Sequence, residues 1–504
     1  MRLRTHIQAL LPAQLLVVYF IAGNWLRHGH LFEISELRYW IAFWLILPTI
    51  IYIVFLRIFK KSYAAGLALI PTIAFLFFLV PVHNTFREWH VYRKWMIFPV
   101  VFLITGSALM GYLIRIRKKQ LALTGATTRL FALMVLFMLG SDVVARINYL
   151  ERMNFSLHEI PELHSEANKL NPDSLPNILY VVFDMHGSTR ALQQQIGYDN
   201  SALDSQLTKA GFKIWPNASS PTNFTPATLT SIFNLAYPKA ANEITTTNTL
   251  AFYEALYLLQ HNIFIPFLHG NHYASVNAGL FAIEKNDKSY FKHPFTWGTP
   301  EVVVTNQFLP NFLFHTYRWA WSKLLPQFIK PVPNLWHATD IKMTRLVLEK
   351  LEHSIRDTTH QPKFIYGHFL LPHEPFKFDS TGNTIPYTKK MYYDGTLNHY
   401  YAAQVAYCRN IMQQLTEETI GKNPQKWIVI FQGDHSLRRP ELNLPDPLSF
   451  QVLHAVYEPG NKDTLILTEP FSTVNTFRYV LNKYFKTQLP LLPVKTFQYN
   501  LLPE

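Results

Sequence analysis

Residues 223–233 read NFTPATLTSIF, and the rest of the chain can be organised around this stretch. Its apolar members Leu229, Ile232 and Phe233 recur at helical spacing directly after a Thr-Pro pair. Threonine is favoured as a helix N-cap, and proline is favoured at the first helical position. We therefore predict that a helix begins here with Thr225 as its N-cap. At this end of a helix, unpaired backbone N–H groups and the helix dipole attract anions and phosphate. A purely structural capping threonine would give the same local pattern, so the remaining motifs decide between the two.

The basic character of the chain is concentrated at its N-terminal end. Residues 1–150 contain 16 Lys and Arg against 4 Asp and Glu, whereas the remaining 354 residues contain 30 against 29. Basic residues that flank apolar runs suit a membrane surface, and the nearly neutral remainder argues against a nucleic-acid partner. The single cysteine, Cys408, excludes an intramolecular disulfide and a cysteine-rich metal site.

Five apolar stretches predict that residues 1–150 form a bundle of five transmembrane helices. They are 9–25, 39–56, 64–82, 95–114 and 130–144. Most approach the ~20 residues that cross a hydrocarbon core. With five spans, ten flanking Lys and Arg residues lie on the same side of the membrane as the N-terminus, and seven lie on the opposite side. Because basic loops stay in the cytoplasm, this excess places the N-terminus inside. An odd number of spans then delivers the rest of the chain to the extracytoplasmic, or periplasmic, side of the inner (cytoplasmic) membrane.

After a polar linker at 151–175, residues 176–504 alternate between strand and helix patterns. Runs rich in β-formers occupy 177–183, 364–371 and 427–431, and helical patterns occupy 201–210, 339–356 and 400–416. This alternation predicts one α/β domain with a mostly parallel central sheet. Residues 285–335 fit neither pattern and are not placed.

Polar residues follow the predicted strands at the edge where open α/β sheets bind ligands. Asp184 follows the first run, and the pair Asp434-His435 follows the third. Carboxylates with an imidazole suit one divalent metal, Zn²⁺ or Mn²⁺, and a hydroxyl that completes the shell would be activated by it. We therefore expect Asp184, Thr225, Asp434 and His435 to bind the metal. An aspartate after a strand is also a common turn cap, so no single residue carries this expectation.

Taken in order, these motifs resemble the alkaline phosphatase and sulfatase superfamily. The resemblance is to its membrane-bound branch, which includes lipoteichoic acid synthases and phosphoethanolamine transferases and has five membrane spans before an extracytoplasmic sulfatase-like domain. The matching residues are the strand-terminal acid Asp184, the nucleophile motif Thr225, Thr228, Leu229 and Phe233, the segment HEPF from His373 to Phe376, and the metal pair Asp434-His435.

The resemblance implies catalytic roles for Thr225, as nucleophile, and for His373, which would face the substrate phosphate. We also expect His368, Asn223 and Arg438 to contact the substrate, although His368 and His373 also fit a purely structural role in a loop. Two departures stand out. An aspartate, Asp184, stands where the transferases typically carry glutamate, and neither Thr225 nor Cys408 supplies the residue that formylglycine sulfatases need, so ordinary sulfate-ester hydrolysis is not expected.

The sequence therefore predicts a metal-dependent phospho-transferase of the cell envelope. It would move a phospholipid head group, of phosphoethanolamine or phosphoglycerol type, through a phospho-threonine intermediate to a glycan or lipid acceptor. Two alternatives remain open. One is a hydrolase that uses the same site and gives the group to water, and the other is a non-catalytic membrane protein whose sulfatase-like domain binds glycans.

The topology is testable by reporter fusions. A reporter that is active only outside the cytoplasm should be active when fused after Glu504 and silent when fused after Lys61, because basic flanks stay inside. The reverse pattern would contradict the predicted orientation.

Overall fold

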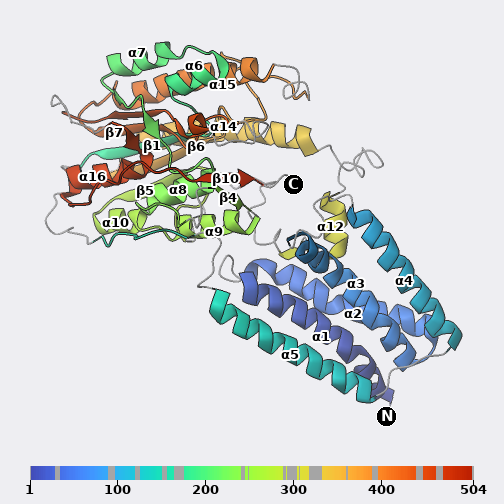
Figure 1. Ribbon diagram of the computed structural model, residues 1–504. Coiled ribbons are helices and arrows are strands. Elements are labelled where there is room, and N and C mark those ends of the chain that lie inside the picture. Colours follow the sequence, from blue (N-terminus) through green and yellow to red (C-terminus); the bar gives the residue numbers. More distant parts are fainter. Residues whose placement is uncertain are drawn as a thin grey trace. The chain divides into compact units, whose positions relative to one another are not determined.

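The computed structural model describes residues 2–28, 34–88, 97–119, 125–149, 156–163, 175–239, 244–247, 249–285, 287, 291, 304–305, 307–316, 332–358, 361–388, 396–438, 446–460 and 469–501. The chain divides into two compact units (Figure 1). Unit 1 comprises Met1–Met153 together with Thr296–Val332, and unit 2 comprises Asn154–Phe295 together with Pro333–Glu504. The predicted linker lies largely outside the described residues, and its limits stay a prediction.

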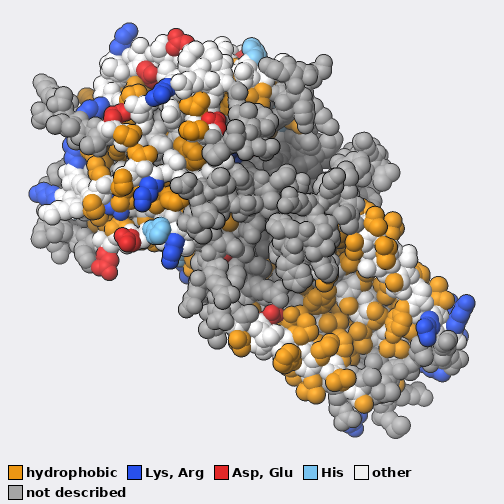
Figure 2. Space-filling view, in the orientation of Figure 1, with side chains coloured by type: hydrophobic (Ala, Val, Ile, Leu, Met, Phe, Trp, Pro, Cys, Tyr) orange, Lys and Arg blue, Asp and Glu red, His pale blue; other side chains and the backbone are white. Residues whose placement is uncertain are grey.

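Unit 1 is a helical bundle. Its helices are α1 (Arg2–His28), α2 (Arg38–Phe59), α3 (Ser62–Glu88), α4 (Ile97–Lys119), α5 (Gly125–Tyr149) and α12 (Leu309–Thr316), with a 3-10 turn η1 (Ile34–Leu37) before α2. Large apolar side chains such as Leu103, Ile104 and Phe137 are exposed on the bundle. Figure 2 shows hydrophobic side chains spread over the visible face of this unit. Such a surface suits a hydrocarbon environment.

Four helices of the described part are long and apolar enough to cross a membrane. The apolar segments are Leu3–Leu26, Arg38–Phe59, Ser62–Asn84 and Phe98–Lys118. The fifth predicted span falls on α5, whose apolar segment Leu133–Val144 is shorter. The membrane character of the N-terminal region is thus supported, while the count of five spans stays a prediction. This count matters because its parity decides the side of the membrane on which unit 2 lies.

Described residues between 304 and 316, within the stretch that the sequence left unplaced, contribute to the core of unit 1. The ring of Phe308 lies 4.8 Å from that of Phe77 and 6.1 Å from that of Trp44, and Phe312 lies 4.6 Å from Phe98. Leu309 is buried among these side chains. Helix α12 therefore packs within the helical bundle of unit 1, although the chain before and after it belongs to unit 2.

Unit 2 is an α/β domain. Its strands are β1 (Asn177–Phe183), β2 (Lys213–Ile214), β3 (Ala218–Ser219), β4 (Ile244–Thr247), β5 (Ala274–Ala278), β6 (Lys363–Phe369), β7 (Trp427–Gly433), β8 (His454–Tyr457), β9 (Phe471–Ser472) and β10 (Gln498–Leu501). Its helices are α6 (Thr189–Ile196), α7 (Ser201–Lys209), α8 (Thr225–Phe233), α9 (Thr249–Gln260), α10 (Phe264–Gly270), α14 (Val332–Arg356), α15 (Leu397–Thr419) and α16 (Thr476–Phe485), with 3-10 turns η7 (Pro447–Phe450) and η8 (Thr473–Asn475).

The central sheet has the order β2-β8-β7-β1-β6-β5. Strands β7, β1, β6 and β5 are mutually parallel, and β8 runs antiparallel to β7. Alternate residues of each strand face opposite sides. Tyr180 and Ile430 pack with α8, α10 and α16, whereas Val181 and Phe431 pack with α7, α14 and α15. The predicted α/β fold with a mostly parallel sheet is confirmed, and strands buried on both faces explain the unbroken apolar runs.

The strand register brings the candidate ligands together. Phe183 of β1 pairs with Gly433 of β7 and with Phe369 of β6, so the residues that follow β1 and β7 leave the sheet side by side. A Cβ atom at Gly433 would lie 2.1 Å from the carbonyl oxygen of His186. Only glycine therefore allows β7 to approach the turn after β1 closely enough to place Asp434 beside Asp184.

Candidate metal centre and active site

The ends of three neighbouring strands supply four polar side chains to one place. Asp184 follows β1, the pair Asp434-His435 follows β7, and His368 is the penultimate residue of β6. All four side chains are buried. Three of the four predicted metal ligands, all except Thr225, therefore belong to this cluster. His368, which was predicted to bind substrate, belongs to it as well. Ligand atoms of Asp184, His368 and Asp434 lie within 4.8 Å of one another, as do those of Asp184, His373 and His435.

Four ligand atoms of this cluster have no hydrogen-bond partner in the described part of the chain: Asp184 Oδ1, Asp434 Oδ2, His368 Nε2 and His435 Nε2. His435 Nε2 lies 3.6 Å from Asp184 Oδ1 and 3.7 Å from Asp434 Oδ2. His368 Nε2 lies 3.7 Å from Asp184 Oδ2. These separations are too long for hydrogen bonds but resemble the roughly 3.4 Å between ligands at about 2.0–2.2 Å around a tetrahedral Zn²⁺. The donor set therefore fits a divalent cation.

The remaining hydrogen bonds orient these atoms inward. His435 Nδ1 lies 2.8 Å from the carbonyl oxygen of Ser436. A carbonyl oxygen only accepts, so Nδ1 carries the proton and Nε2 presents its lone pair to the carboxylates. Asp434 Oδ1 accepts the backbone N–H groups of Met185 and His435, both at 2.9 Å, which leaves Oδ2 for a cation. Such contacts fix the orientation of metal ligands.

The electrostatics of the cluster agree with this role. Burial lowers the pKa of His435, which keeps its imidazole neutral and able to bind a metal. Burial alone would raise the pKa of Asp184, but the neighbouring imidazoles of His373, His368 and His435 outweigh burial, and the pKa lies below its ordinary value. An ionised carboxylate beside a neutral imidazole is a donor set suited to Zn²⁺ or Mn²⁺.

Thr225 lies at the start of α8, but the helix cap is one residue earlier than predicted. Phe224 has an extended backbone with φ −135° and ψ 110°, and its carbonyl accepts the Thr228 N–H at 3.0 Å. The reason is Thr222, whose hydroxyl accepts the Phe224 N–H at 3.2 Å and lies 2.7 Å from the Thr228 hydroxyl. Thr225 itself is partly exposed and its side chain makes no hydrogen bond to a described residue, so its hydroxyl is available at the helix N-terminus.

Arg438 connects the segment that carries Thr225 to His373. Its Nη1 lies 3.5 Å from the carbonyl oxygen of Asn223, and its Nη2 lies 3.3 Å from His373 Nε2. His373 Nδ1 lies 2.6 Å from the carbonyl oxygen of Glu374, so Nδ1 donates there and Nε2 accepts from Arg438. The ring centroids of His373 and His435 are 6.3 Å apart. His373 and Arg438 therefore lie beside the metal cluster.

The side chain of Asn223 has a structural partner. Its Oδ1 accepts the backbone N–H of Tyr499 at 2.7 Å, and the Phe497 N–H donates to the carbonyl of Pro221 at 2.9 Å. These bonds join β10 and the residue that precedes it to the segment before Thr225. The predicted contact of Asn223 with substrate stays a prediction, and its carboxamide oxygen is engaged here.

Sequence reasoning missed the residues that support the site from behind. The Tyr366 hydroxyl lies 3.1 Å from His368 Nδ1, and the Tyr401 hydroxyl donates to the carbonyl of Met185 at 2.6 Å. Tyr366 and His368 are two residues apart on one strand and so share a face, which is the one signal that could have paired them. Tyr401 belongs to a helix distant in sequence, and a single sequence gives no sign of its partner.

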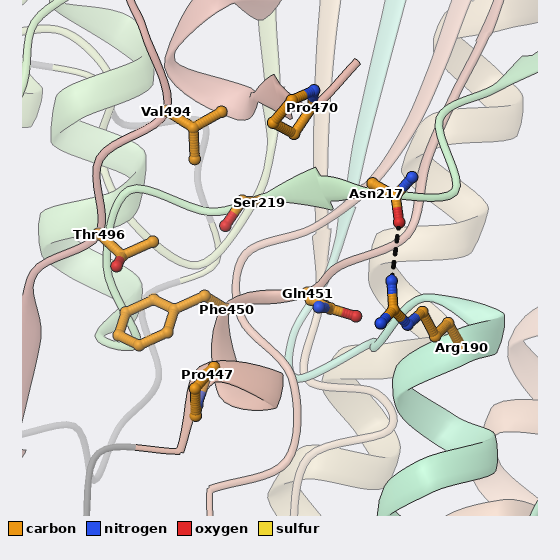
Figure 3. A pocket seen from close by; sticks show the side chains of 9 residues that line it. All are labelled: Arg190, Asn217, Ser219, Pro447, Phe450, Gln451, Pro470, Val494 and Thr496. Carbon is orange, nitrogen blue, oxygen red and sulfur yellow. Dashed lines mark hydrogen bonds between the residues drawn. The ribbon is translucent and has the colours of Figure 1, made fainter.

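A cavity of about 540 Å³ lies in unit 2 (Figure 3). Its lining residues are Arg190, Asn217, Ser219, Pro447, Phe450, Gln451, Pro470, Val494 and Thr496. In Figure 3 the Arg190 guanidinium reaches the Asn217 side chain, with a hydrogen bond of 3.2 Å. The backbone N–H of Ser220 donates to the carbonyl of Phe450 at 2.8 Å. The cavity therefore shares a wall with the segment that leads to Thr225.

Comparison with known proteins finds similarity in structure. No family model matches the chain, and no curated protein matches its sequence. The C-terminal periplasmic domain of EcEptC from Escherichia coli, in complex with Zn, is 12% identical with a TM-score of 0.38, over 65% of this chain and 86% of that chain. The lipoteichoic acid synthase LtaP from Listeria monocytogenes is 14% identical with a TM-score of 0.37, over 67% of this chain and 77% of that chain.

A third similar structure is the soluble domain of lipooligosaccharide phosphoethanolamine transferase A from Neisseria meningitidis, 12% identical with a TM-score of 0.34 over 65% of this chain and 90% of that chain. The similar structures are thus enzymes of the kinds that the sequence motifs resemble. Because the TM-scores are below 0.5, any function of this chain has to rest on its own residues.

The metal centre is testable by removing a ligand. Asp434→Asn and His435→Gln should each lower metal content after purification, with an affinity loss of at least about 100-fold, because each removes a direct donor. Both variants should keep their secondary structure, because the ligands follow the strands rather than fill the core. Metal content is measured by mass spectrometry of the purified protein.

His399→Gln is the matched control, because His399 is exposed on α15 and far from the cluster in sequence. It should keep full metal content. Full occupancy in Asp434→Asn and His435→Gln would show that these residues are not the ligands.

Proposed function

We propose that the chain is a metal-dependent phospho-transferase of the cell envelope. It moves a phospholipid head group, of phosphoethanolamine or phosphoglycerol type, through a phospho-threonine intermediate to a glycan or lipid acceptor. The observation that carries the proposal is the set of four buried, unpartnered donor atoms on Asp184, His368, Asp434 and His435. The available hydroxyl of Thr225 at a helix N-terminus supplies the nucleophile.

The residues divide the chemistry between them. One divalent cation, Zn²⁺ or Mn²⁺, would be held by Asp184, Asp434 and His435 together with Thr225, with His368 close by. When bound, this cation acts as a Lewis acid toward phosphoryl oxygens and lowers the pKa of a nearby hydroxyl. A threonine hydroxyl needs such activation, because it is a weak nucleophile at its ordinary pKa.

The first half-reaction transfers the head group to the protein. The bond between Thr225 Oγ1 and phosphorus forms, the P–O bond to diacylglycerol breaks, and the threonine proton ends on the diacylglycerol hydroxyl. Arg438 and the N-terminus of α8 offer positive charge and N–H donors to the phosphoryl oxygens. His373, hydrogen-bonded to Arg438, assists the leaving oxygen or the phosphoryl oxygens.

In the second half-reaction an acceptor hydroxyl replaces Thr225 on phosphorus, and its proton returns to the threonine. The cavity of Figure 3 supports a hydroxyl-rich acceptor such as a glycan. Its volume lies within the range of about 300–1,000 Å³ that is usual for ligand sites. Phe450 and Pro447 offer an apolar surface for a sugar ring, while Asn217, Ser219 and Gln451 offer hydrogen bonds to hydroxyl groups.

A hydrolase that uses the same site is the second candidate. Thr225 is partly exposed, so water can reach a phospho-threonine at this position. Transfer and hydrolysis share the first half-reaction and differ only in the acceptor. We propose that unit 2 acts on the extracytoplasmic side of the inner membrane, where the phospholipid donor is a membrane component.

Removing the nucleophile separates catalysis from binding. Thr225→Ala should lower turnover of phosphatidylethanolamine or phosphatidylglycerol by at least about 10³-fold, because no other described hydroxyl replaces it at this position. Thr225→Ser should keep part of the activity, since it keeps the hydroxyl but loses the methyl group that restricts χ1. Wild-type protein incubated with either lipid should gain the head-group mass on the Thr225 peptide.

Thr208→Ala, at an exposed threonine of α7, is the control and should retain activity. Wild-type turnover by Thr225→Ala would end the covalent mechanism. A wild type with neither an adduct nor turnover on both lipids would favour the non-catalytic, glycan-binding protein.

The acceptor site has a test of its own. Arg190→Ala should lower transfer to a sugar acceptor about 10-fold and leave formation of the Thr225 adduct unchanged, because the guanidinium lines the cavity rather than the metal centre. Arg345→Ala, at an exposed arginine of α14, is the control. Equal transfer rates in both variants would exclude the cavity as the acceptor site, and both rates are read from radiolabelled head-group transfer.

A further inference from the structure

A lysine is buried four residues after His373. Lys377 is 0% exposed, and its Nζ donates to the carbonyl of Leu370 at 2.6 Å and to that of His373 at 3.2 Å. Asp340 of α14 lies 3.7 Å from the same Nζ and is also buried. Burying an ammonium group costs several kcal/mol unless it is paired and hydrogen-bonded, so such a residue needs a local explanation.

A second buried side chain holds the same turn. Gln404 of α15 donates from Nε2 to the carbonyl of Pro372 at 2.9 Å and to that of His373 at 3.3 Å. Its Oε1 accepts the backbone N–H groups of Lys377 at 2.8 Å and Phe378 at 3.3 Å. The carbonyl of His373 thus receives two buried donors, and the turn from 370 to 378 is fixed at several of its polar groups.

These contacts leave the His373 ring to face the site. Its two nitrogens contact the carbonyl of Glu374 and Arg438, and its centroid lies 6.3 Å from that of His435. The backbone is therefore held on one side, and the imidazole projects toward the metal centre on the other. An imidazole on an unsupported turn would sample several directions, and a misplacement of ~1 Å can cost about 100-fold in rate.

We propose that Lys377 is the positioning residue for His373: its buried ammonium group holds the turn so that the imidazole stays against Arg438 and the metal centre. Asp340 compensates the charge of Lys377, and Gln404 completes the hydrogen bonds of the turn. Lys377 itself touches no reacting atom. Its catalytic consequence rests on the function proposed above, whereas its effect on the geometry of His373 does not.

The chain contains a matched control on the strand that precedes this turn. Lys363, the first residue of β6, is also buried, and its Nζ lies 2.9 Å from Asp357 Oδ2. It lies at the amino end of the strand, whereas the site lies at the carboxyl end. Lys363→Met thus removes the ion pair of a buried lysine with an exposed aspartate without touching the turn of His373.

The experiment compares Lys377→Met with Lys363→Met in the purified full-length chain. Methionine keeps most of the length of lysine and removes the charge. The first readout is the rate at which diethyl pyrocarbonate modifies His373, followed on its peptide by mass spectrometry. We expect this rate to rise several-fold in Lys377→Met, because the freed turn exposes the ring, and to equal the wild-type rate in Lys363→Met.

The second readout is turnover of vesicles of phosphatidylethanolamine and phosphatidylglycerol. In Lys377→Met we expect kcat to fall about 10- to 100-fold with KM nearly unchanged and zinc content retained. Lys363→Met should keep the wild-type kcat. If the wild type shows no turnover, the proposed function fails, and the reactivity of His373 still decides the positioning role.

Asp340→Asn provides a second variant if Lys377→Met does not fold. It keeps the volume of the side chain and removes the charge that compensates Lys377, so it should change His373 reactivity and kcat in the same direction and to a smaller extent. Wild-type reactivity of His373 in every folded variant of this pair would overturn the proposal. Equal effects of Lys377→Met and Lys363→Met would also overturn it, because they would show a general loss of stability.

Discussion

The α/β unit depends on one constraint. Carboxylate and imidazole atoms are buried close together and make no hydrogen bond to one another. Asp184 Oδ1, Asp434 Oδ2, His368 Nε2 and His435 Nε2 converge at the carboxyl edge of the sheet. The second polar atoms of Asp434, His368 and His435 are each in contact with a partner outside the cluster. An unpartnered buried polar atom costs about 1–3 kcal/mol or more, and a cation among these atoms would remove that cost. The parallel register of β1, β6 and β7 makes the convergence unavoidable.

The rest of the site is assembled around this cluster from distant parts of the chain. The segment before Thr225 is fixed by Thr222 on one side and by the C-terminal residues 497–499 on the other. Arg438 spans from this segment to His373, and Lys377 with Gln404 holds the turn behind His373. The reactive groups themselves lie at strand and helix ends, while buried polar side chains from α14 and α15 set their directions. This division suits a site whose polar groups must be both accessible and rigid.

The sequence was informative where chemistry coincides with a backbone pattern. Asp184 and Asp434-His435 follow apolar strands, and the edge of a parallel sheet is where such residues must meet. The cap of α8 was misplaced by one residue, because the Thr222–Thr228 contact is not visible in the helical pattern. His368 lies within an apolar run, so its approach to Asp184 depends on the register of β6 against β1.

Other features depend on contacts between segments that no periodicity records. Lys377 is an ordinary lysine in the sequence, and only the packing of α14 and α15 reveals that it is buried. The described residues between 304 and 316 carried no clear pattern, because their apolar side chains complete a core supplied by helices at the start of the chain. The fifth membrane span rests on α5, whose apolar stretch is short, and so the orientation of unit 2 needs the reporter fusions rather than further reading of the sequence.

Anomalous X-ray diffraction at the metal edge, on crystals of the purified protein, tests the central claim most directly. We expect one strong anomalous peak bounded by Asp184, Asp434 and His435, with ligand distances of about 2.0–2.2 Å and the Thr225 hydroxyl or its phosphorylated form facing it. A cluster without an anomalous peak in metal-supplemented crystals, with the same side-chain positions, would contradict the account.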